Sequence, residues 1–577
     1  MSQIRRQSDN PPKISQRLAT LAKKLGYGSR YHEYRLKGKH PLRLLGTPKD
    51  PWDGSAVAAS HILSGRFYCE GQILKNPAHK NGEWSAGEIW QAKDVNLKWQ
   101  QYLHSFCWLR DLERAVDRAA ARKRALALAD HWLREFDHWR EMVWSPDIIG
   151  QRITNWMSYA PLVLDSNDLI YRSKILNSLA RQARHLYHAG DDQLRGLPRI
   201  RALGGLALAG LYIPHGDNWL KAATSLLEAA IDQEIFRDGG VASRNPQDIY
   251  LVLQIFLMLR TSYRTMGHNI PEKLDGAINR MTPMLKTLLH GDGRLALFNG
   301  SAAQDEKDLK AIFAFSKADE SGPSVTDSPQ SGFRRLHQGS TVIIMDCGPP
   351  ADMAVSQHCH AGTLSFEMSH GKQRIIVNCG RGSFLSGQKT ENDLEKLSRT
   401  TAAHSTLVLQ DKNSSEIRTD GLIGRGPTLV TSQCHTEDGH SLLEASHDGY
   451  LSRSGIMHHR NIYINETGED IRGEDILKLR NTNVKPGNKS LNFDIRFHIH
   501  PDITIVRQGA TDRLLLRLPT SEYWQFQCSG GGILLEESLY LGDGSRPQNC
   551  QQIILSGSAK KSETTVKWSL RLIEHVT

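Results

Sequence analysis

Three histidines carry the clearest chemistry in this chain. His358 and His360 are one residue apart in a Q-H-C-H segment, and His404 lies in a later T-A-A-H-S-T segment. In an extended strand, alternate side chains point to the same face, so His358 and His360 are expected to share one. Such a face could hold a proton acceptor beside a metal or anion ligand. The alternative is a pair of strand-edge histidines bonded to backbone carbonyls, the commoner role of a lone H-x-H pair.

The elements that must position these histidines differ between the two halves of the chain. From Asn96 to Leu289 apolar residues recur at helical spacing, as Trp99 and Leu103 do, with short breaks between runs. This half is expected to be an array of helical hairpins. From Gly332 onward, short β-branched runs such as Ser340 to Met345 alternate with turn residues. That half is expected to be antiparallel sheet.

A chain of 577 residues is too long for one hydrophobic core. We therefore predict an α+β multidomain protein in four segments. These are a basic N-terminal arm, partly disordered or peripheral (1–45), a helical domain (46–300), an exposed linker (301–331) and a domain of antiparallel β-sheet (332–577).

The composition also limits where the protein works. No apolar run reaches about eighteen residues, so no membrane-spanning helix is expected. Residues 1–10 are polar and basic, and residues 14–25 lack a small-residue cleavage site, so no secretory signal is expected. Eight cysteines without C-x-x-C spacing indicate free thiols in a reducing compartment. We expect a cytoplasmic protein, with the periplasm or cell envelope as the alternative.

The net charge of +10 suggests a polyanionic partner. The excess is concentrated between Arg5 and Lys39, and no RNP, zinc-finger or helix-turn-helix signature accompanies it. A basic surface also attracts carboxylates and sulfates. We therefore expect an acidic polysaccharide or oligosaccharide as partner and no nucleic acid; the alternative is a solvated basic arm. A homodimer is left open.

Several motifs together resemble the heparinase II/III family of polysaccharide lyases. In the C-terminal half these are H-x-H-x-x-x-x-S-F-E, a strand ending in Asn378-Cys379-Gly380, and R-x-T-A-A-H-S-T. Similar segments elsewhere are Asp238 to Pro246, Trp144 to Pro146, Arg152 to Trp156, Ser446 to Tyr450, Arg496 to Pro501 and Glu536 to Ser538. The resemblance covers most of the chain but does not specify a substrate.

The resemblance implies an incomplete (α/α) toroid followed by stacked antiparallel β-sheets, with the active site between them. It also implies a carbon–oxygen lyase that cleaves a uronic-acid-containing polysaccharide by β-elimination. Such a reaction needs groups that neutralise the uronate carboxylate, a base that takes the C5 proton, and an acid that protonates the leaving oxygen.

The family motifs supply the expected site residues. His358 matches the family's catalytic histidine, and Arg244, Asn245 and Asp248 fall in the segment that resembles R-S-P-x-Y. Arg244 is expected to bind the acidic group. Trp144 and Trp156 are the tryptophans best placed in family-like segments to stack on sugar rings, although tryptophan at helical spacing is more often core.

The metal prediction also comes from the resemblance. His360 and His404 match positions that hold a structural zinc in some family members. Two histidines and an aspartate suit zinc, but Asn378 stands where that aspartate is expected, and Gly362 replaces the aspartate of H-x-H-x-D. A structural zinc is thus possible, and no other cofactor is implied.

The helical half departs from the family pattern at its acid or base. Asp248 occupies the position of the family tyrosine, and Tyr250 lies two residues on, about 200° further round a helix. The family's Asn-His pair should fall near Leu197-Pro198, where Arg199 and Arg201 could neutralise a carboxylate instead.

These departures leave three readings. The protein is a divergent lyase, with Tyr250 and Asp248 as further candidate catalytic groups, or a catalytically altered carbohydrate-binding protein in envelope or exopolysaccharide metabolism. The third and least favoured reading is hydrolysis by a carboxylate pair, Asp248 with Asp238 or Glu367.

Overall fold

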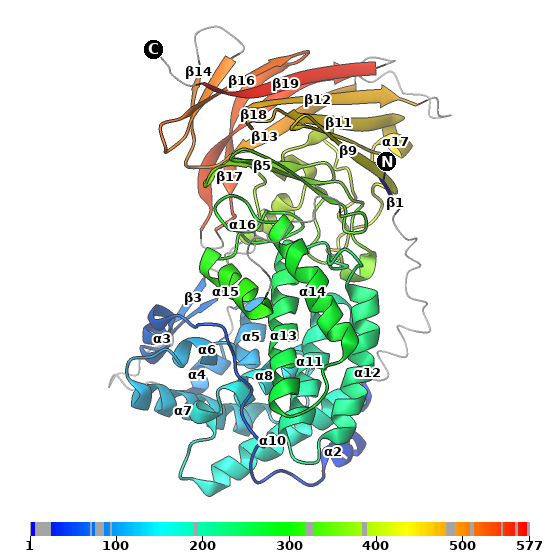
Figure 1. Ribbon diagram of the computed structural model, residues 1–577. Coiled ribbons are helices and arrows are strands. Elements are labelled where there is room, and N and C mark those ends of the chain that lie inside the picture. The colour runs from blue at the N-terminus through cyan, green and yellow to red at the C-terminus, as the bar shows by residue number, and fades with distance from the viewer. Residues whose placement is uncertain are drawn as a thin grey trace.

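The computed structural model describes residues 2–5, 25–69, 72–75, 86–92, 95–189, 194–317, 328–382, 389–480, 491–507, 513–543, 546–559 and 563–573. The chain forms a helical domain with a β-sheet domain stacked on one end of it (Figure 1). In the described residues, no helix is long and apolar enough to cross a membrane.

The helical domain is a set of helices packed side by side around α11. Its longer helices are α3 (Ala56–Leu63), α5 (Leu97–Ser105), α7 (Arg118–Phe136), α8 (Pro146–Ser158), α10 (Leu169–Ala189), α11 (Gly196–Tyr212), α12 (Asp217–Glu234), α13 (Pro246–Thr265), α14 (Glu272–Thr287) and α15 (Glu306–Ser316). Shorter elements are α2 (Arg30–Leu36), α4 (Ala86–Trp90), α6 (Leu109–Leu112), α9 (Ala160–Val163) and a hairpin of β2 (Arg66–Cys69) with β3 (Gln72–Lys75). Helix α11 is apolar nearly all round because α8, α10, α12 and α13 all contact it.

Local sequence determines where α13 begins and how closely α8 and α11 cross. Helix α13 begins at Pro246, and the side chain of Asn245 caps it by accepting a hydrogen bond from Gln247 N at 2.8 Å. Helices α8 and α11 cross closely at two glycines. A Cβ on Gly150 would lie 2.2 Å from the carbonyl oxygen of Arg201, so only glycine allows this crossing.

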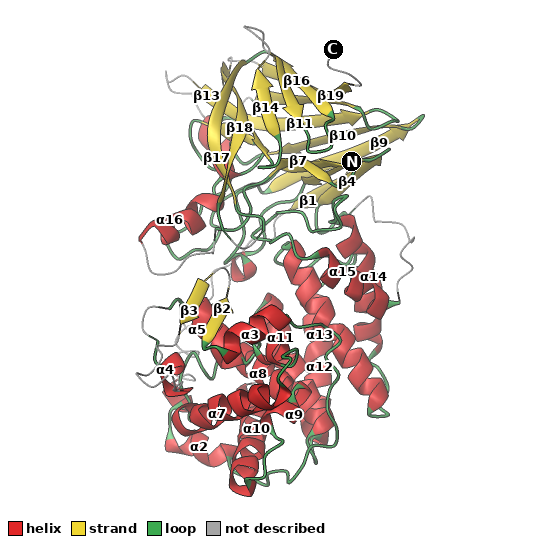
Figure 2. Cartoon of the chain, turned by 90° about the vertical axis from the view of Figure 1, so that its left-hand side faces the viewer, coloured by secondary structure: helices red, strands yellow, loops and turns green. Residues whose placement is uncertain are grey.

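The β-sheet domain contains two stacked sheets, visible at the top of Figure 2. The nine-stranded sheet has the order β1 (Ser2–Arg5), β9 (Leu429–Glu437), β10 (His440–His447), β11 (Ile456–Ile464), β12 (Asp470–Leu479), β19 (Glu563–Ile573), β16 (Tyr523–Ser529), β15 (Arg513–Arg517) and β14 (Thr504–Arg507). The eight-stranded sheet has the order β17 (Gly532–Tyr540), β18 (Gln548–Ala559), β13 (Leu491–Ile499), β7 (Gln373–Val377), β6 (Phe366–His370), β5 (Thr341–Asp346) and β4 (Phe333–Gln338), and β8 (Leu407–Leu409) pairs with β13. All pairings are antiparallel.

The eight-stranded sheet is covered on both faces, which explains its continuous apolar strands. On β5, Ile343 and Met345 join the core between the two sheets, whereas Val342 and Ile344 join the core of the helical domain. Across the two sheets, the rings of Phe366 and Trp568 stack at 5.5 Å. The helical core thus continues into the β-sheet domain, which fixes the position of the loops between them.

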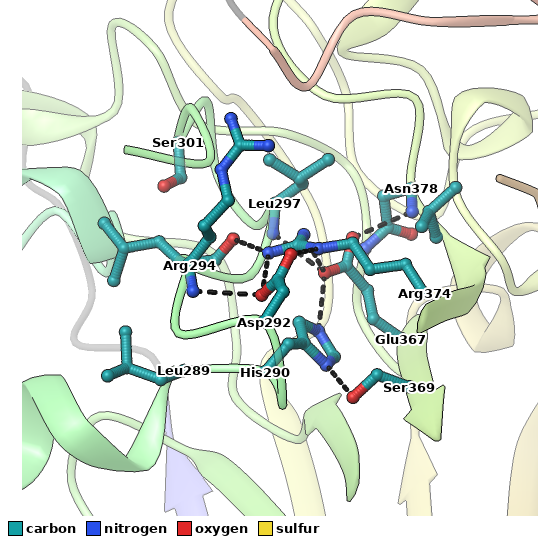
Figure 3. Close-up of polar contacts among 12 residues, drawn as sticks. Leu289, His290, Asp292, Arg294, Leu297, Ser301, Glu367, Ser369, Arg374 and Asn378 are labelled. Atoms are coloured by element: carbon teal, nitrogen blue, oxygen red, sulfur yellow. Dashed lines mark hydrogen bonds and ion pairs between the residues drawn. The ribbon is translucent and has the colours of Figure 1, made fainter. Parts of the chain in front are cut away.

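A buried polar cluster at the domain junction strengthens this contact (Figure 3). Glu367 on β6 accepts hydrogen bonds from His290 Nε2 at 3.1 Å and Leu297 N at 3.0 Å, both in the segment after α14. Arg374 on β7 pairs with Asp292 at 2.8 Å. The cluster therefore joins the end of the helical domain to the eight-stranded sheet. Asn378 directly follows β7 of that sheet.

The division into segments stays a prediction, but two segments contain elements that we did not expect. Ser2–Arg5 forms β1, which pairs with β9 in the nine-stranded sheet. Helix α15 lies within 301–331 and packs against α13 and α14. Residues 6–24 of the basic arm lie outside the described residues.

Candidate active site

His358 lies in an irregular loop between the short helix η1 (Met353–Val355) and β6. The expected strand is absent from this segment, so the prediction that His358 and His360 share a face is wrong. His358 is exposed and His360 is buried. Long-range bonds bend the loop: Arg399 Nε donates to the carbonyl oxygen of Cys359 at 2.9 Å, and Ala361 N donates to that of Arg399.

Both domains meet around His358. A Cβ on Gly300, in the helical domain, would lie 2.6 Å from the carbonyl oxygen of His358, and Gly300 has φ of +82°. The surrounding protein and the cations Arg381, Lys98 and Arg399 lower the pKa of His358 to about 3, although the residue as a whole is exposed. The imidazole is therefore neutral near pH 7 and can accept a proton.

His360 and His404 form a buried hydrogen-bonded pair. His360 Nδ1 lies 3.0 Å from His404 Nε2, and His404 Nδ1 lies 2.7 Å from the carbonyl oxygen of Thr400. A carbonyl oxygen only accepts, so the pattern assigns the proton of His404 to Nδ1 and that of His360 to its own Nδ1. Burial lowers the pKa of both rings, so both are neutral.

The residues predicted to hold zinc do not form a suitable set of donors. The two imidazoles bond to each other, and Asn378 Oδ1 already accepts a hydrogen bond from Ser405 N at 3.0 Å. A neutral amide oxygen in that situation is a poor substitute for a carboxylate. In the described ranges, no group of three His, Cys, Asp or Glu side chains could hold a metal ion.

One of the cations that lower the pKa of His358, Arg381, also acts on a carboxyl group, that of Asp248. Asp248, in the first turn of α13, accepts a hydrogen bond from the Ser243 hydroxyl at 2.6 Å. Burial raises the pKa of Asp248, whereas this hydrogen bond and the cations Arg201 and Arg381 act in the opposite direction. Arg381 acts on His358 as well. We call the set His358, Asp248, Lys98, Arg201, Arg381 and Arg399 the interdomain site.

The elements of the interdomain site come from distant parts of the chain. Lys98 is on α5, and its ammonium group lies 3.8 Å from Glu395 on α16 (Lys389–Ser398), a helix of the β-sheet domain. Figure 2 shows α16 beside the junction of the two domains. The site combines a neutral base, a carboxylate and several cations, a set that suits an anionic ligand with a proton to transfer.

Comparisons with known proteins agree with this architecture. Residues 320–569 match the family model described as Heparinase II/III-like, C-terminal. The β-sheet half of the chain is thus similar to the C-terminal domain of the heparinase II/III-like family. The toroid and stacked sheets of the chain are shared with the solved structure of Heparinase III, with a TM-score of 0.71 at 14% identity, covering 98% of this chain and 93% of that one. The heparan sulfate lyase HepC from Pedobacter heparinus has a TM-score of 0.60 at 15% identity, covering 98% and 89%. These likenesses confirm the predicted fold class.

One sequence relative is similar over nearly the whole chain. It is FtsZ-localized protein C from Caulobacter vibrioides, 28% identical over 564 residues, which are 95% of this chain and 93% of the relative. The similarity spans the helical domain and the sheets alike.

Arg244 does not reach the interdomain site, contrary to what the heparinase II/III-like motif implied. It is buried, and it donates to the carbonyl oxygens of Ser331 at 2.7 Å and Pro349 at 2.6 Å while its guanidinium pairs with Asp346. All three of its nitrogens thus have protein partners. Asn245 is also buried, where it caps α13.

Arg199 and Tyr250 are likewise turned into the helical domain. Arg199 is buried and bonds to Gln233 at 2.5 Å and to Glu234 at 3.4 Å. Tyr250 accepts a hydrogen bond from Gln254 at 2.7 Å, and burial raises its pKa. Of the two arginines predicted near the start of α11, Arg201 is the one whose charge acts on Asp248.

Trp144 and Trp156 are core residues, so the prediction that they stack on sugar is wrong. Trp144 is 1% exposed and donates to the carbonyl oxygen of Phe136 at 2.9 Å. Trp156 is fully buried against Trp132. The Trp144 ring packs against His185 of α10, and the Trp156 ring packs against Trp132 of α7.

The two carboxylates named as partners of Asp248 for hydrolysis, Glu367 and Asp238, already have hydrogen-bond partners within the protein. Glu367 is buried in the junction cluster, and Asp238 accepts hydrogen bonds from Ser331 N at 2.7 Å and Gln330 N at 2.8 Å.

Sequence reasoning missed Lys98 and Arg381 as site residues. Arg399 was visible as the first residue of the R-x-T-A-A-H-S-T motif, the one available signal.

Proposed function

We propose that this protein binds a uronic-acid-containing polysaccharide or oligosaccharide at the interdomain site and cleaves it by β-elimination. One observation carries the proposal: His358 is an exposed residue whose imidazole is neutral, because its surroundings and the charges of Arg381, Lys98 and Arg399 lower its pKa. A base beside cations is what proton abstraction next to a carboxylate requires.

The cations have a specific part in this chemistry. The C5 proton of a uronate is hard to remove because the adjacent carboxylate opposes a second negative charge. Arg381 and Lys98 would stabilise the charge that develops when His358 takes this proton. The same cations favour the neutral form of His358 and so keep it ready as a base.

We assign the role of the acid to Asp248. As the C4–C5 double bond forms, the C4–O4 bond breaks and O4 needs a proton. Burial raises the pKa of Asp248, which favours its protonated form. This assignment puts a carboxyl group in the role of the family tyrosine, whose position Asp248 occupies.

The test is an assay of unsaturated product. The protein is incubated with a panel of uronic-acid polymers, and ultraviolet absorbance reports the new double bond. His358→Ala should lower the rate by about 100-fold or more. His435→Ala is the matched control, because His435 is an exposed histidine on β9 far along the chain from the site. Equal rates in both variants would overturn the role of His358.

A second function is favoured by particular observations. Asp248 replaces the family tyrosine, Tyr250 points away, and the name of the Caulobacter relative connects that protein with FtsZ rather than with a sugar. We therefore carry the alternative of a catalytically altered carbohydrate-binding protein that acts in the cell envelope. Saturable binding of an acidic polymer without unsaturated product or new reducing ends would favour it.

A further inference from the structure

A charged side chain lies in the core between the two sheets. Alternate residues of β11 face that core, and Ile456, Ile462 and Ile464 belong to it. Arg460 occupies the same alternating positions and is fully buried. Burying a guanidinium costs free energy that well-packed apolar residues of similar volume would not cost. The charge therefore indicates a role beyond the packing of the core.

One buried carboxylate compensates this charge. Asp475, opposite Arg460 on β12, accepts hydrogen bonds from its Nε at 2.8 Å and its Nη2 at 3.1 Å. Asp475 also accepts hydrogen bonds from His458 Nε2 at 2.7 Å and from the indole of Trp568 at 3.0 Å. Two of the three guanidinium nitrogens thus fix the side chain, and Nη1 is left for other acceptors.

Nη1 of Arg460 bonds to the backbone of the two segments that carry the site histidines. It donates to the carbonyl oxygen of Leu364 at 2.9 Å and to that of Ser405 at 2.8 Å. Leu364 lies in the loop of His358, shortly before β6, and Ser405 directly follows His404. One buried nitrogen therefore joins these two segments, which are far apart in the sequence.

The backbone of Leu364 needs external support. Its φ is +62°, in the left-handed region that residues with a Cβ seldom adopt. Its side chain is buried in the core between the sheets, and its N–H donates to the carbonyl oxygen of Asp346 at 2.8 Å. Strained backbone persists only where surrounding contacts hold it. The bond from Arg460 is one of the contacts that keep this loop in its conformation.

We propose that Arg460 is a positioning residue of the interdomain site. Its Nη1 holds the loop of His358 against the segment of His404 and so fixes the position of the base. Because Arg460 is fully buried, it acts through the loop and not on a ligand. The inference rests on the proposed function for the role of His358. It goes beyond that function by extending control of the base to β11, a strand that carries no residue of the interdomain site.

The test uses Arg460→Lys. Lysine keeps a positive charge beside Asp475, but its single nitrogen cannot also hold both carbonyl oxygens. Hydrogen–deuterium exchange of the full chain reports on the loop without an assay of activity. The amides of Ala361 and Leu364 are hydrogen-bonded in the wild-type protein. Exchange over residues 361–365 should become at least about tenfold faster in Arg460→Lys, because loss of the bonds from Nη1 favours local opening.

Arg152→Lys is the matched control. Arg152 is fully buried on α8, and its Nη1 likewise donates to two carbonyl oxygens, those of His104 at 2.9 Å and Val143 at 3.1 Å. This variant should leave exchange over residues 361–365 unchanged. A second variant, Arg460→Met with Asp475→Asn, removes both charges together and leaves no unpaired buried ion, so it guards against a failure of Arg460→Lys to fold. It should show the same faster exchange.

Two results would overturn the proposal. One is wild-type exchange over residues 361–365 in a folded Arg460→Lys or double variant. The other is an increase of equal size throughout the chain or in Arg152→Lys, which would show a general loss of stability.

Elimination kinetics separate this proposal from the proposed function. On a polymer that gives unsaturated product, Arg460→Lys should lower kcat by about tenfold and leave KM unchanged, because the residue positions the base without binding the sugar. Selectively faster loop exchange in Arg460→Lys, with no elimination by the wild-type protein, supports the positioning role and rejects the lyase. Elimination that is lost in His358→Ala but keeps its kcat in Arg460→Lys supports the lyase and rejects the positioning role.

Discussion

His360 Nδ1 lies 3.0 Å from His404 Nε2, and the carbonyl oxygen of Thr400 fixes the orientation of the pair. The two rings satisfy each other without an ion. Gly362 is part of this arrangement, because a Cβ there would lie 2.7 Å from the His404 ring. The aspartate expected from an H-x-H-x-D motif therefore could not fit at residue 362 while His404 keeps this position.

Removal of metal should have no effect on the fold. We expect the purified protein to contain less zinc than one ion per chain, and chelation with EDTA to leave its thermal unfolding midpoint unchanged, because Asn378 and the histidine pair are already hydrogen-bonded. Elemental analysis and calorimetry measure the two quantities. Stoichiometric zinc whose loss lowers the midpoint, and which His404→Ala abolishes, would show that this reading of the pair is wrong.

Stability should fall in mild acid because buried histidines stay neutral in the folded state. The pKa of His498 is lowered to about 3 by burial, with Nε2 donating to the carbonyl oxygen of Ala402 at 2.9 Å. The unfolded chain binds a proton near pH 6.5, so stability is fully present above that value and is lost as the pH falls toward 3. For one such group the loss at pH 5 is about 2 kcal/mol.

Denaturant unfolding at pH 7.5 and pH 5 measures this difference. In a His498→Gln variant, the decrease in free energy of unfolding between the two pH values should be smaller by about 2 kcal/mol. The exposed His435→Gln is the control and should keep the wild-type decrease. An unaltered decrease in His498→Gln would mean that this histidine is protonated in the folded protein.

Arg244 should contribute to stability and not to ligand binding. Arg244→Met leaves Asp346 as an unpaired buried carboxylate, so the free energy of unfolding should fall by about 3–5 kcal/mol. The double variant with Asp346→Asn should recover part of this loss. A folded Arg244→Met protein of normal stability that no longer forms unsaturated product would instead place Arg244 at the ligand.

The fold was predictable because its signals are local. Periodicity gave the helices and the β-branched runs, and Pro246 marked the start of α13. The strand assignment for H-x-H failed because a bond from Arg399, forty residues further along the chain, bends the loop at Cys359. Local alternation contains no information about such a partner.

The site was predictable only in part, for a related reason. His358 and Asp248 could be identified by motif, but the charges of Lys98, Arg381 and Arg201, which act on them, come from three separate segments. Whether an arginine is paired in the core or available at the site depends on the tertiary structure. Arg199 and Arg201 are two residues apart on one helix and have opposite roles.

The glycine crossing of α8 and α11 should control the position of Arg201. In Gly150→Ala the new methyl group would meet the carbonyl oxygen of Arg201, so the helices must separate, and stability should fall by about 1–3 kcal/mol with slower elimination. Gly276→Ala on α14 is the matched control, because its nearest neighbour is 3.8 Å away and alanine favours a helix. If Gly150→Ala forms unsaturated product as fast as the control, the crossing does not position Arg201.

The acid role of Asp248 can be tested through its hydrogen bond to Ser243. Asp248→Asn should reduce elimination by about 100-fold. Ser243→Ala removes a bond that favours the ionised carboxylate, so the pKa of Asp248 should rise and the alkaline limb of the pH–rate profile should move to higher pH. A loss of rate in Ser243→Ala without movement of that limb would mean that Ser243 only supports the start of α13, and that another group protonates the leaving oxygen.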